Sequence, residues 1–202
     1  MNEKCNKNQT IQYYNQNAAA FVENTRNVDF HPIQDEFLEK LPDGACILDL
    51  GCGSGRDTKY FLERGYEVDA IDGSKELCTM ASEYTGIPVK CQLFQEFDEV
   101  EKYDGIWACS SLLHLSLGEL DEVLYRIEKA LKPQGILYMS FKHGVFEGER
   151  NGRYFLDFTE EKLNQLLENH EGLRQLRSFQ TEDARPNREE KWLNLFLKKT
   201  NS

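Results

Sequence analysis

The sequence predicts a doubly wound α/β domain, with a mostly parallel sheet that helices cover on both faces. Two observations carry this prediction. Apolar strand-like runs alternate with helical segments along the chain, which is typical of parallel strands joined by crossover helices. The first apolar run ends in a glycine-rich turn directly before a helix, where doubly wound sheets bind their ligands. The 202 residues suit one domain with a substantial core.

Two helices are expected before the first strand. Residues 1–10 are polar and should be frayed, whereas apolar side chains recur at helical spacing over 11–25. A second helix is expected over 32–41, because Pro32 suits a first helical turn. Residues 45–50 then form a continuous apolar run that ends before a glycine, as expected of a strand buried on both faces.

Four more helices are expected between and after the strands. Residues 55–65 end at Gly65, a residue that terminates helices. Ser74 is a suitable N-cap for a helix over 75–84. Residues 118–132 have an apolar face, as expected of a helix that packs on the sheet. Thr159 is a suitable N-cap for the last helix, which is expected over 159–169. The remaining strands are short apolar runs at 67–71, 89–94, 103–109, 135–141, 173–179 and 192–198.

The charge of the chain excludes several classes of partner. Its 24 Lys and Arg against 35 Asp and Glu give a net charge of −11 and a pI near 4.9. General nucleic-acid binding needs a basic surface and is not expected, and neither is electrostatic binding to a membrane. No apolar stretch approaches the roughly 18 residues of a membrane span, and the N-terminus lacks the apolar core of a signal peptide. A small molecule is the expected partner.

The six cysteines indicate a reducing compartment rather than a metal site. None form a C-x-x-C pair, and no histidine cluster has the spacing of zinc ligands, so no metal site is expected. Most lie inside apolar runs, where a reduced cysteine behaves as a small hydrophobic residue. We therefore expect a cytoplasmic protein in a reducing environment.

The glycine-rich segment ILDLGCGSGRD, residues 47–57, is the most informative part of the chain. Its glycines let the backbone approach a ligand, and the helix that follows offers free N–H groups. These glycines are Gly51, Gly53 and Gly55. The third comes one residue too early for the G-x-G-x-x-G pattern of dinucleotide binding, which opposes a nucleotide-dependent oxidoreductase. Asp49 would repel a pyrophosphate and attract an ammonium group, and Asp72 is placed to accept hydrogen bonds from a ribose diol. The pattern favours a cationic ligand that carries a ribose.

The motifs DLGCGSG and AIDGS resemble those of the class I S-adenosylmethionine-dependent methyltransferases, and the resemblance extends from about Tyr13 to Lys198. Within that family, the small bacterial tellurite-resistance-type methyltransferases look most similar. The resemblance implies a Rossmann-like, seven-stranded sheet whose last strand, 192–198, is antiparallel. It also implies one domain over residues 1–202, with an N-terminal helical lid (1–43), a cofactor-binding core (44–141) and substrate-side loops with the final strands (142–202).

The resemblance further implies S-adenosyl-L-methionine as the cofactor and a set of residues that hold it. Asp49 and the backbone of the glycine loop would hold the methionine end, Asp72 would bind the ribose hydroxyls, and the residues after the third strand would contact the adenine. The expected cofactor contacts are Tyr14, Asp49, Gly51, Cys52, Gly53, Gly55, Arg56, Asp72, Gly73, Ser74, Glu96, Phe97 and Cys109.

Catalysis of methyl transfer depends first on alignment, and on a general base only where the acceptor is protonated. His114, just after the fourth strand, is the candidate base, and a packing or pocket-lining role is the alternative. Ser110 and Ser111 could orient a substrate or hydrogen-bond within the turn. In the N-terminal helix, Tyr14 could contact the cofactor and Arg26 a carboxylate, or the helix could simply pack on the sheet.

Five cations in two segments after the fifth strand could form an acceptor site: Lys142, Arg150, Arg153, Arg185 and Arg188. In an acidic chain such a cluster favours an anionic acceptor, whereas solvated charges paired with nearby acids are the alternative.

The sequence therefore predicts an enzyme that transfers a methyl group from S-adenosylmethionine to a small molecule. Methylation of RNA or protein, and a non-catalytic module that binds S-adenosylmethionine or S-adenosylhomocysteine, stay open as alternatives. No pattern indicates an oligomeric state.

Overall fold

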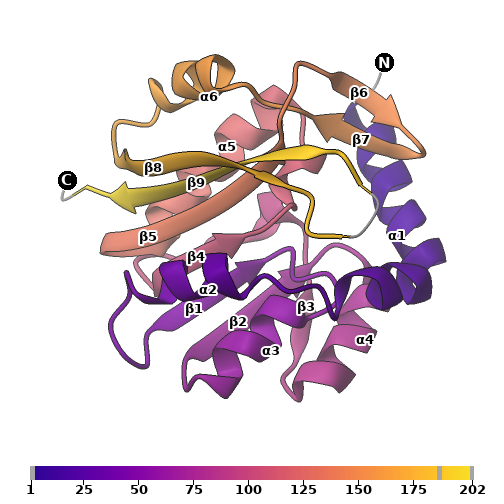
Figure 1. Cartoon of the computed structure of the whole chain (residues 1–202), viewed down its shortest axis with the longest axis horizontal. Coiled ribbons are helices and arrows are strands. Elements are labelled where there is room, and N and C mark those ends of the chain that lie inside the picture. Colours follow the sequence, from indigo (N-terminus) through magenta and orange to yellow (C-terminus); the bar gives the residue numbers. More distant parts are fainter. Residues whose placement is uncertain (1–2, 186–187, 201–202) are drawn as a thin grey trace.

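A computed structural model describes residues 3–185 and 188–200 of the chain (Figure 1). Its main sheet has seven strands in the order β3-β2-β1-β4-β5-β9-β8. The strands of this sheet are β1 (Cys46–Leu50), β2 (Glu67–Asp72), β3 (Val89–Cys91), β4 (Tyr103–Ala108), β5 (Leu131–Lys142), β8 (Leu173–Glu182) and β9 (Lys191–Lys199). β9 runs antiparallel to both of its neighbours, and the other pairs are parallel. The predicted doubly wound sheet with an antiparallel last strand is confirmed.

The helices lie on both faces of the sheet and at one of its ends. They are α1 (Glu3–Thr25), α2 (His31–Leu38), α3 (Arg56–Glu63), α4 (Lys75–Thr85), α5 (Leu117–Ala130) and α6 (Glu160–Leu167), with the short 3₁₀ helices η1 (Phe94–Glu96) and η2 (Leu112–His114). The predicted capping residues are correct, because the hydroxyls of Ser74 and Thr159 accept backbone N–H groups of their helices. The expectation of a frayed segment over residues 1–10 is wrong, since α1 already begins at Glu3.

The core divides into two layers because side chains alternate across each strand. On β4, Ile106 belongs to the layer that α5 and α6 cover, whereas Trp107 belongs to the layer beneath α2 and α3. Strand β5 repeats this alternation with Leu137 and Tyr138. The Trp107 and Tyr138 rings stack at a centroid distance of 4.0 Å. The continuous apolar runs of the sequence are therefore explained by burial on both faces.

A second, two-stranded sheet was not predicted. Strands β6 (Glu147–Arg150) and β7 (Arg153–Leu156) form a hairpin in the segment expected to be a loop. Its turn residues Asn151 and Gly152 both have positive φ, as the tight turns of two-residue hairpins require. The Asn-Gly pair is the sequence signal that could have revealed this hairpin.

The hairpin and α1 lie together at the carboxyl-terminal edge of the parallel strands, on the right of Figure 1. The hydroxyl of Thr10 on α1 accepts the backbone N–H of Tyr154 on β7 at 3.0 Å. Farther along α1, Ala18 and Val22 pack against Leu77 of α4. The helix therefore spans from the hairpin to α4 across the edge where the glycine loop lies.

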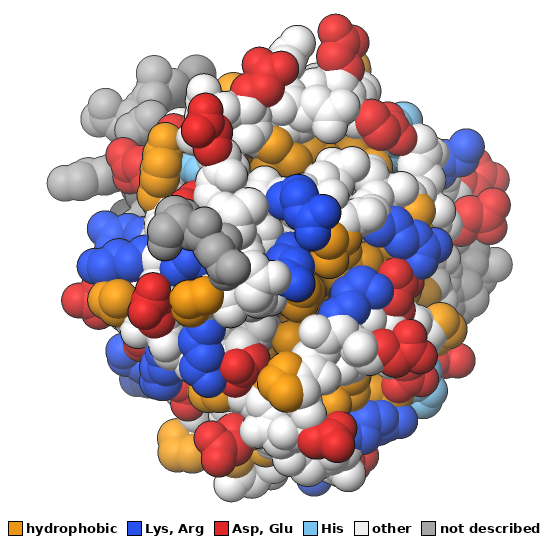
Figure 2. Space-filling view, turned by 90° about the vertical axis from the view of Figure 1, so that its left-hand side faces the viewer, with side chains coloured by type: hydrophobic (Ala, Val, Ile, Leu, Met, Phe, Trp, Pro, Cys, Tyr) orange, Lys and Arg blue, Asp and Glu red, His pale blue; other side chains and the backbone are white. Residues whose placement is uncertain are grey.

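The surface carries both signs of charge despite the net negative total. Figure 2 shows Lys and Arg side chains among Asp and Glu side chains, beside exposed hydrophobic surface. No helix among the described residues is long and apolar enough to cross a membrane. The described residues also contain no group of three or more His, Cys, Asp or Glu side chains arranged to hold a metal ion.

Candidate active site

The glycine loop has the conformation that its glycines allow. Gly51, Gly53 and Gly55 have φ of +87°, +54° and +77°, a region that other residues rarely adopt. A Cβ atom on Gly51 would lie 2.5 Å from the Cβ of Ser111, so this position also permits close packing against the turn after β4. The backbone N–H groups of Gly51 and Cys52 both donate to the carbonyl of Ile71, which ties the loop to β2.

Asp72 lies at the end of β2 and fixes the opposite side of the loop. Its carboxylate accepts the backbone N–H of Gly53 at 2.9 Å and that of Ser74 at 2.8 Å. Burial raises the pKa of Asp72, and the backbone donors partly oppose that shift. A half-buried carboxylate thus lies beside the glycines, where the sequence analysis placed Asp72.

A cavity of about 370 Å³ opens beside this loop at the carboxyl-terminal edge of the sheet. It extends from the turn after β3, past the glycine loop, to the hairpin and the segment before β9. Most of the predicted site residues line it: Tyr14, Gly51, Cys52, Gly53, Arg56, Asp72, Gly73, Ser74, Cys109, His114, Lys142, Arg153, Arg185 and Arg188. The fold thus gathers side chains from both halves of the chain at one place.

Five of the predicted residues do not line this cavity: Asp49, Gly55, Glu96, Phe97 and Arg150. Gly55 is instead required by helix packing, because a Cβ there would lie 2.9 Å from Thr85 of α4. Phe97 is only 1% exposed and belongs to the core. Glu96 folds back onto the backbone N–H of Leu93. Arg150 turns away from the cavity to pair with Asp157 at 2.9 Å. Arg26, expected near a carboxylate, lies over the ring of Tyr84 at 4.1 Å.

Asp49 lies behind the loop rather than in the cavity. It is 2% exposed and accepts a hydrogen bond from the Thr58 hydroxyl at 2.6 Å. Burial, followed by the nearby Asp57 carboxylate, raises the pKa of Asp49 well above the usual range of a carboxyl group. Arg56 and Asp57 line the cavity at this place, whereas Asp49 does not.

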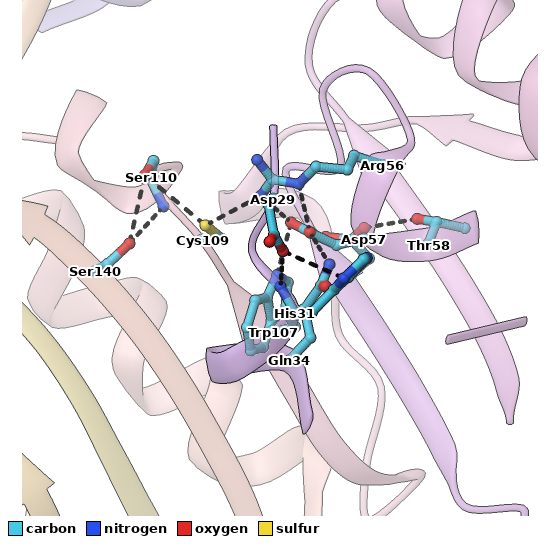
Figure 3. Close-up of polar contacts among 11 residues, drawn as sticks. Asp29, His31, Gln34, Arg56, Asp57, Thr58, Trp107, Cys109, Ser110 and Ser140 are labelled. Atoms are coloured by element: carbon cyan, nitrogen blue, oxygen red, sulfur yellow. Dashed lines mark hydrogen bonds and ion pairs between the residues drawn. The ribbon is translucent and has the colours of Figure 1, made fainter. Parts of the chain in front are cut away.

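Asp57 is the centre of a hydrogen-bond network that the sequence analysis did not assign (Figure 3). Its carboxylate accepts from Gln34 of α2 at 2.6 Å, from Trp107 of β4 at 2.9 Å, and from two nitrogens of Arg56 at 2.8 and 2.9 Å. The Arg56 guanidinium also lies 3.7 Å from the Cys109 sulfur and 4.7 Å from the Phe30 ring. These contacts hold Arg56 at the cavity wall beside the glycine loop.

The turn after β4 continues this network (Figure 3). Ser110 has a φ of +53°, which is unusual for a residue with a side chain, and its backbone N–H donates to the Ser140 hydroxyl. Ser111 donates its hydroxyl to the Leu50 carbonyl at 2.6 Å. The Ser110 hydroxyl lies 3.4 Å from that of Ser140, so the hydroxyls of Ser110 and Ser111 both make hydrogen bonds within or beside the turn, in agreement with the alternative reading for these serines. Backbone strain of this kind concentrates at functional sites.

His114 has both ring nitrogens occupied. Nδ1 lies 2.7 Å from the Tyr154 carbonyl, which can only accept, so this nitrogen carries the proton. Nε2 then accepts the hydroxyl of Tyr14 at 2.8 Å. Burial, with the nearby Arg153 and Lys142 as lesser causes, lowers the pKa of His114 to about 4. The predicted base is therefore neutral at physiological pH and is a weak proton acceptor in this environment.

This depressed pKa predicts how stability depends on pH. Between pH 6.5 and about 4 the unfolded chain gains a proton on His114 and the folded chain does not, so acid should destabilise the fold. His114→Gln keeps a donor and an acceptor but cannot titrate, so its melting temperature should fall less between pH 7 and pH 5 than that of the wild type. Thermal unfolding of both proteins at the two pH values tests this. Equal falls would contradict the assigned tautomer and burial.

The cations of the acceptor side differ in their partners. Lys142 pairs with Glu190 at 2.6 Å, and Arg188 lies 3.8 Å from the same residue. Arg185 makes a double hydrogen bond to Asp183, which helps to lower the pKa of that carboxyl to about 2. All three therefore have a carboxylate partner although they line the cavity, but only Arg185 has one of the acids that the sequence analysis considered, since Glu190 was not among them.

Several cavity residues were missed by the sequence analysis. The turn after β3 contributes Gln92, Leu93, Phe94 and Gln95 in place of the predicted Glu96 and Phe97. The side-chain oxygen of Gln92 and the side-chain nitrogen of Gln95 are buried without a hydrogen-bond partner. Such orphaned groups at a cavity wall indicate a ligand that supplies the missing partners. The position of these side chains depends on the 3₁₀ turn of η1, which no periodicity in the sequence predicts.

Comparison with known proteins shows what this part of the chain is similar to. Residues 48–137 match the family model described as a methyltransferase domain. The putative methyltransferase YqeM of Bacillus subtilis (strain 168) is 33% identical over 114 residues, which is 50% of this chain and 46% of that protein. Human N-terminal Xaa-Pro-Lys N-methyltransferase 1 is 36% identical over 101 residues, 46% of this chain and 45% of that protein. The chain thus matches about half the length of these relatives.

Solved structures share the whole fold. The 1,6-didemethyltoxoflavin-N1-methyltransferase of Burkholderia thailandensis, with bound 1,6-didemethyltoxoflavin and S-adenosylhomocysteine, is similar over 100% of this chain and 92% of that chain, with a TM-score of 0.82 and 23% identity. A putative S-adenosylmethionine-dependent methyltransferase from Listeria monocytogenes is similar over 86% of this chain and 100% of that chain, with a TM-score of 0.68 and 20% identity. At these identities the likeness establishes the fold. The tellurite-resistance-type subgroup stays a prediction.

Proposed function

We propose that this chain, which carries a class I S-adenosylmethionine-dependent methyltransferase domain, transfers a methyl group from S-adenosylmethionine to an anionic small molecule. One observation carries the proposal. A single cavity joins the glycine loop and Asp72 to an acceptor chamber, by which we mean its part lined by Lys142, Arg153, Arg185 and Trp192. Cofactor and acceptor can therefore meet in a space lined in part by α1 and the hairpin.

The residues of the cavity fit this cofactor. Asp72 offers a carboxylate to the ribose diol, and the unpartnered amide atoms of Gln92 and Gln95 suit the polar edge of adenine. Arg56 lies beside the glycine loop, where it can bind the carboxylate of the methionine end. When bound, the cofactor supplies a methyl group already activated by the sulfonium. The chain's own task is then to align the acceptor and exclude water.

We further propose that residues 1–43 act as a lid, 44–141 as the cofactor-binding core and 142–202 as the acceptor side of one domain. Helix α1 has non-helical dihedral angles at Asn17 (φ −114°, ψ 15°), which divides it into two parts. The first part contacts the hairpin, and the second packs on α4. A helix divided in this way over a cavity suits an opening movement.

The alternatives differ in what the acceptor chamber should look like. Methylation of a protein N-terminus would bring a positively charged amine close to Arg153, which has no carboxylate partner among the described side chains, whereas Lys142 and Arg185 are each paired with one. RNA would have to approach a chain of net charge −11. A non-catalytic binding module would bind the cofactor without turnover. The unpaired charge of Arg153 therefore favours a small anionic acceptor.

Calorimetric titration and a product assay test the proposal. The protein should bind S-adenosylmethionine and S-adenosylhomocysteine and should not respond to NAD. Incubation with methyl-labelled S-adenosylmethionine and either a small-molecule extract or Xaa-Pro-Lys peptides should label a small-molecule product and leave the peptides unlabelled. NAD binding without a response to the sulfonium would refute the proposal. If the protein binds the cofactor and labels only the peptides, the acceptor is a protein N-terminus and not a small anion.

A further inference from the structure

Arg153 is the cation of the acceptor chamber that has no carboxylate partner. Among the side chains that the structure describes, none of the acidic groups lies within 4 Å of its guanidinium, whereas Lys142, Arg185 and Arg188 each have one. Its Nε is buried without a hydrogen-bond partner. Arg153 therefore brings an uncompensated positive charge and an unused donor to the cavity wall, a combination that favours binding of an anion.

Aromatic rings surround this guanidinium. It lies 4.3 Å from the ring centre of Tyr13, 5.6 Å from that of Tyr14 and 5.1 Å from that of Phe155. Its Nη1 donates to the Tyr14 hydroxyl at 3.3 Å. The Tyr14 hydroxyl is thus fixed between Arg153 and His114. Flat apolar walls around a planar cation suit a flat, aromatic ligand whose negative charge is spread over its ring.

Among the described residues on the acceptor side of the cavity wall, no group is well suited to take a proton from the acceptor. His114 is a weak base with both nitrogens occupied, and Asp57 already accepts from three side chains. Burial raises the thiol pKa of Cys109 to about 12, and that of Cys52 is raised as well, so both are protonated at neutral pH. Two further carboxylates lie on the acceptor side of the wall: Asp183, which holds Arg185, and Glu182, which is exposed.

Resting on the proposed function, we infer that the acceptor is a planar aromatic or heteroaromatic anion, methylated at its own ionised nitrogen or oxygen and bound by Arg153. A lone pair of that atom forms the new bond to the methyl carbon, and the carbon–sulfur bond breaks with its electrons going to sulfur. The anion and the sulfonium become two neutral products, and no proton has to leave. His114 is a positioning residue that orients Tyr14.

Paired probes test this inference with S-adenosylhomocysteine bound at saturation. Lumazine and 4-nitrophenol ionise near neutral pH, whereas 1,3-dimethyllumazine and 4-nitroanisole have the same rings and cannot ionise. At a pH where the first two are ionised, each should bind at least about tenfold more tightly than its neutral partner, the gain expected of a hydrogen bond to a charged group. Their absorbance should also show a lowered pKa in the bound state.

Arg153→Gln should abolish this preference, and Arg153→Lys, which keeps the charge without the planar fork, should retain part of it. Arg150→Gln is the matched control, because Arg150 faces Arg153 across the same hairpin but lies outside the cavity. Equal affinity for charged and neutral probes, a preference that survives in Arg153→Gln, or no binding of any probe would overturn the inference. Failure of S-adenosylhomocysteine to bind would instead overturn the proposed function.

Discussion

Asp72→Ala should weaken binding of S-adenosylhomocysteine about a hundredfold, which corresponds to the loss of two hydrogen bonds from the ribose to a charged acceptor. The effect has two sources in the structure. The carboxylate that would bind the diol disappears, and the backbone N–H groups of Gly53 and Ser74 lose their shared acceptor. Isothermal titration of the variant against the wild type measures the change directly.

Asp69→Ala is the matched control for this variant. Asp69 lies on the same strand, β2, but pairs with Lys102 outside the cavity, so its loss should leave the affinity unchanged. Asp72→Asn separates the two sources, because an amide can still accept one loop hydrogen bond without offering the full charge. It should fall between the wild type and Asp72→Ala. Wild-type affinity in Asp72→Ala would show that another group binds the ribose.

The cofactor end of the cavity could be predicted from the sequence because its signals are local. A strand, an alternating glycine turn and a helix are adjacent in the chain, and the acid at the end of β2 follows at a fixed distance along the sheet. The same reasoning did not place Asp49, which does not line the cavity. Sequence spacing places this residue near the loop, but alternation along β1 turns its carboxylate toward Thr58 and away from the cavity.

The acceptor side could be predicted only in part, because its geometry depends on long-range pairing. Arg153 lines the cavity, whereas Arg150, its partner across the β6–β7 hairpin, is held instead by an ion pair with Asp157. Glu190 neutralises Lys142, although 48 positions separate them in the sequence. The role of His114 likewise depends on Tyr14, 100 positions earlier, whose hydroxyl occupies the ring nitrogen that a general base would need. No local pattern encodes such contacts.

The Gly51→Ala variant should unfold more easily than the wild type and should not bind the cofactor. Gly51 has a φ of +87°, which costs a residue with a side chain about 1–2 kcal/mol. Its new Cβ would also lie 2.5 Å from the Ser111 Cβ and 3.1 Å from the Phe94 ring, and relief of such a clash costs about 1–3 kcal/mol more. Ser111 cannot easily yield, because it is buried and bonded to the Leu50 carbonyl. Chemical denaturation and titration with S-adenosylhomocysteine measure the two effects.

Gly44→Ala distinguishes backbone strain from the steric effect. Gly44 has a similar φ of +68°, but a Cβ there would meet nothing within 4 Å. This variant should therefore lose only about 1–2 kcal/mol of stability and should bind S-adenosylhomocysteine as the wild type does. If the two variants lost the same stability, strain at positive φ would account for the whole effect. The requirement for glycine at position 51 would then come from the backbone alone, and the close approach of the turn after β4 would not constrain the loop.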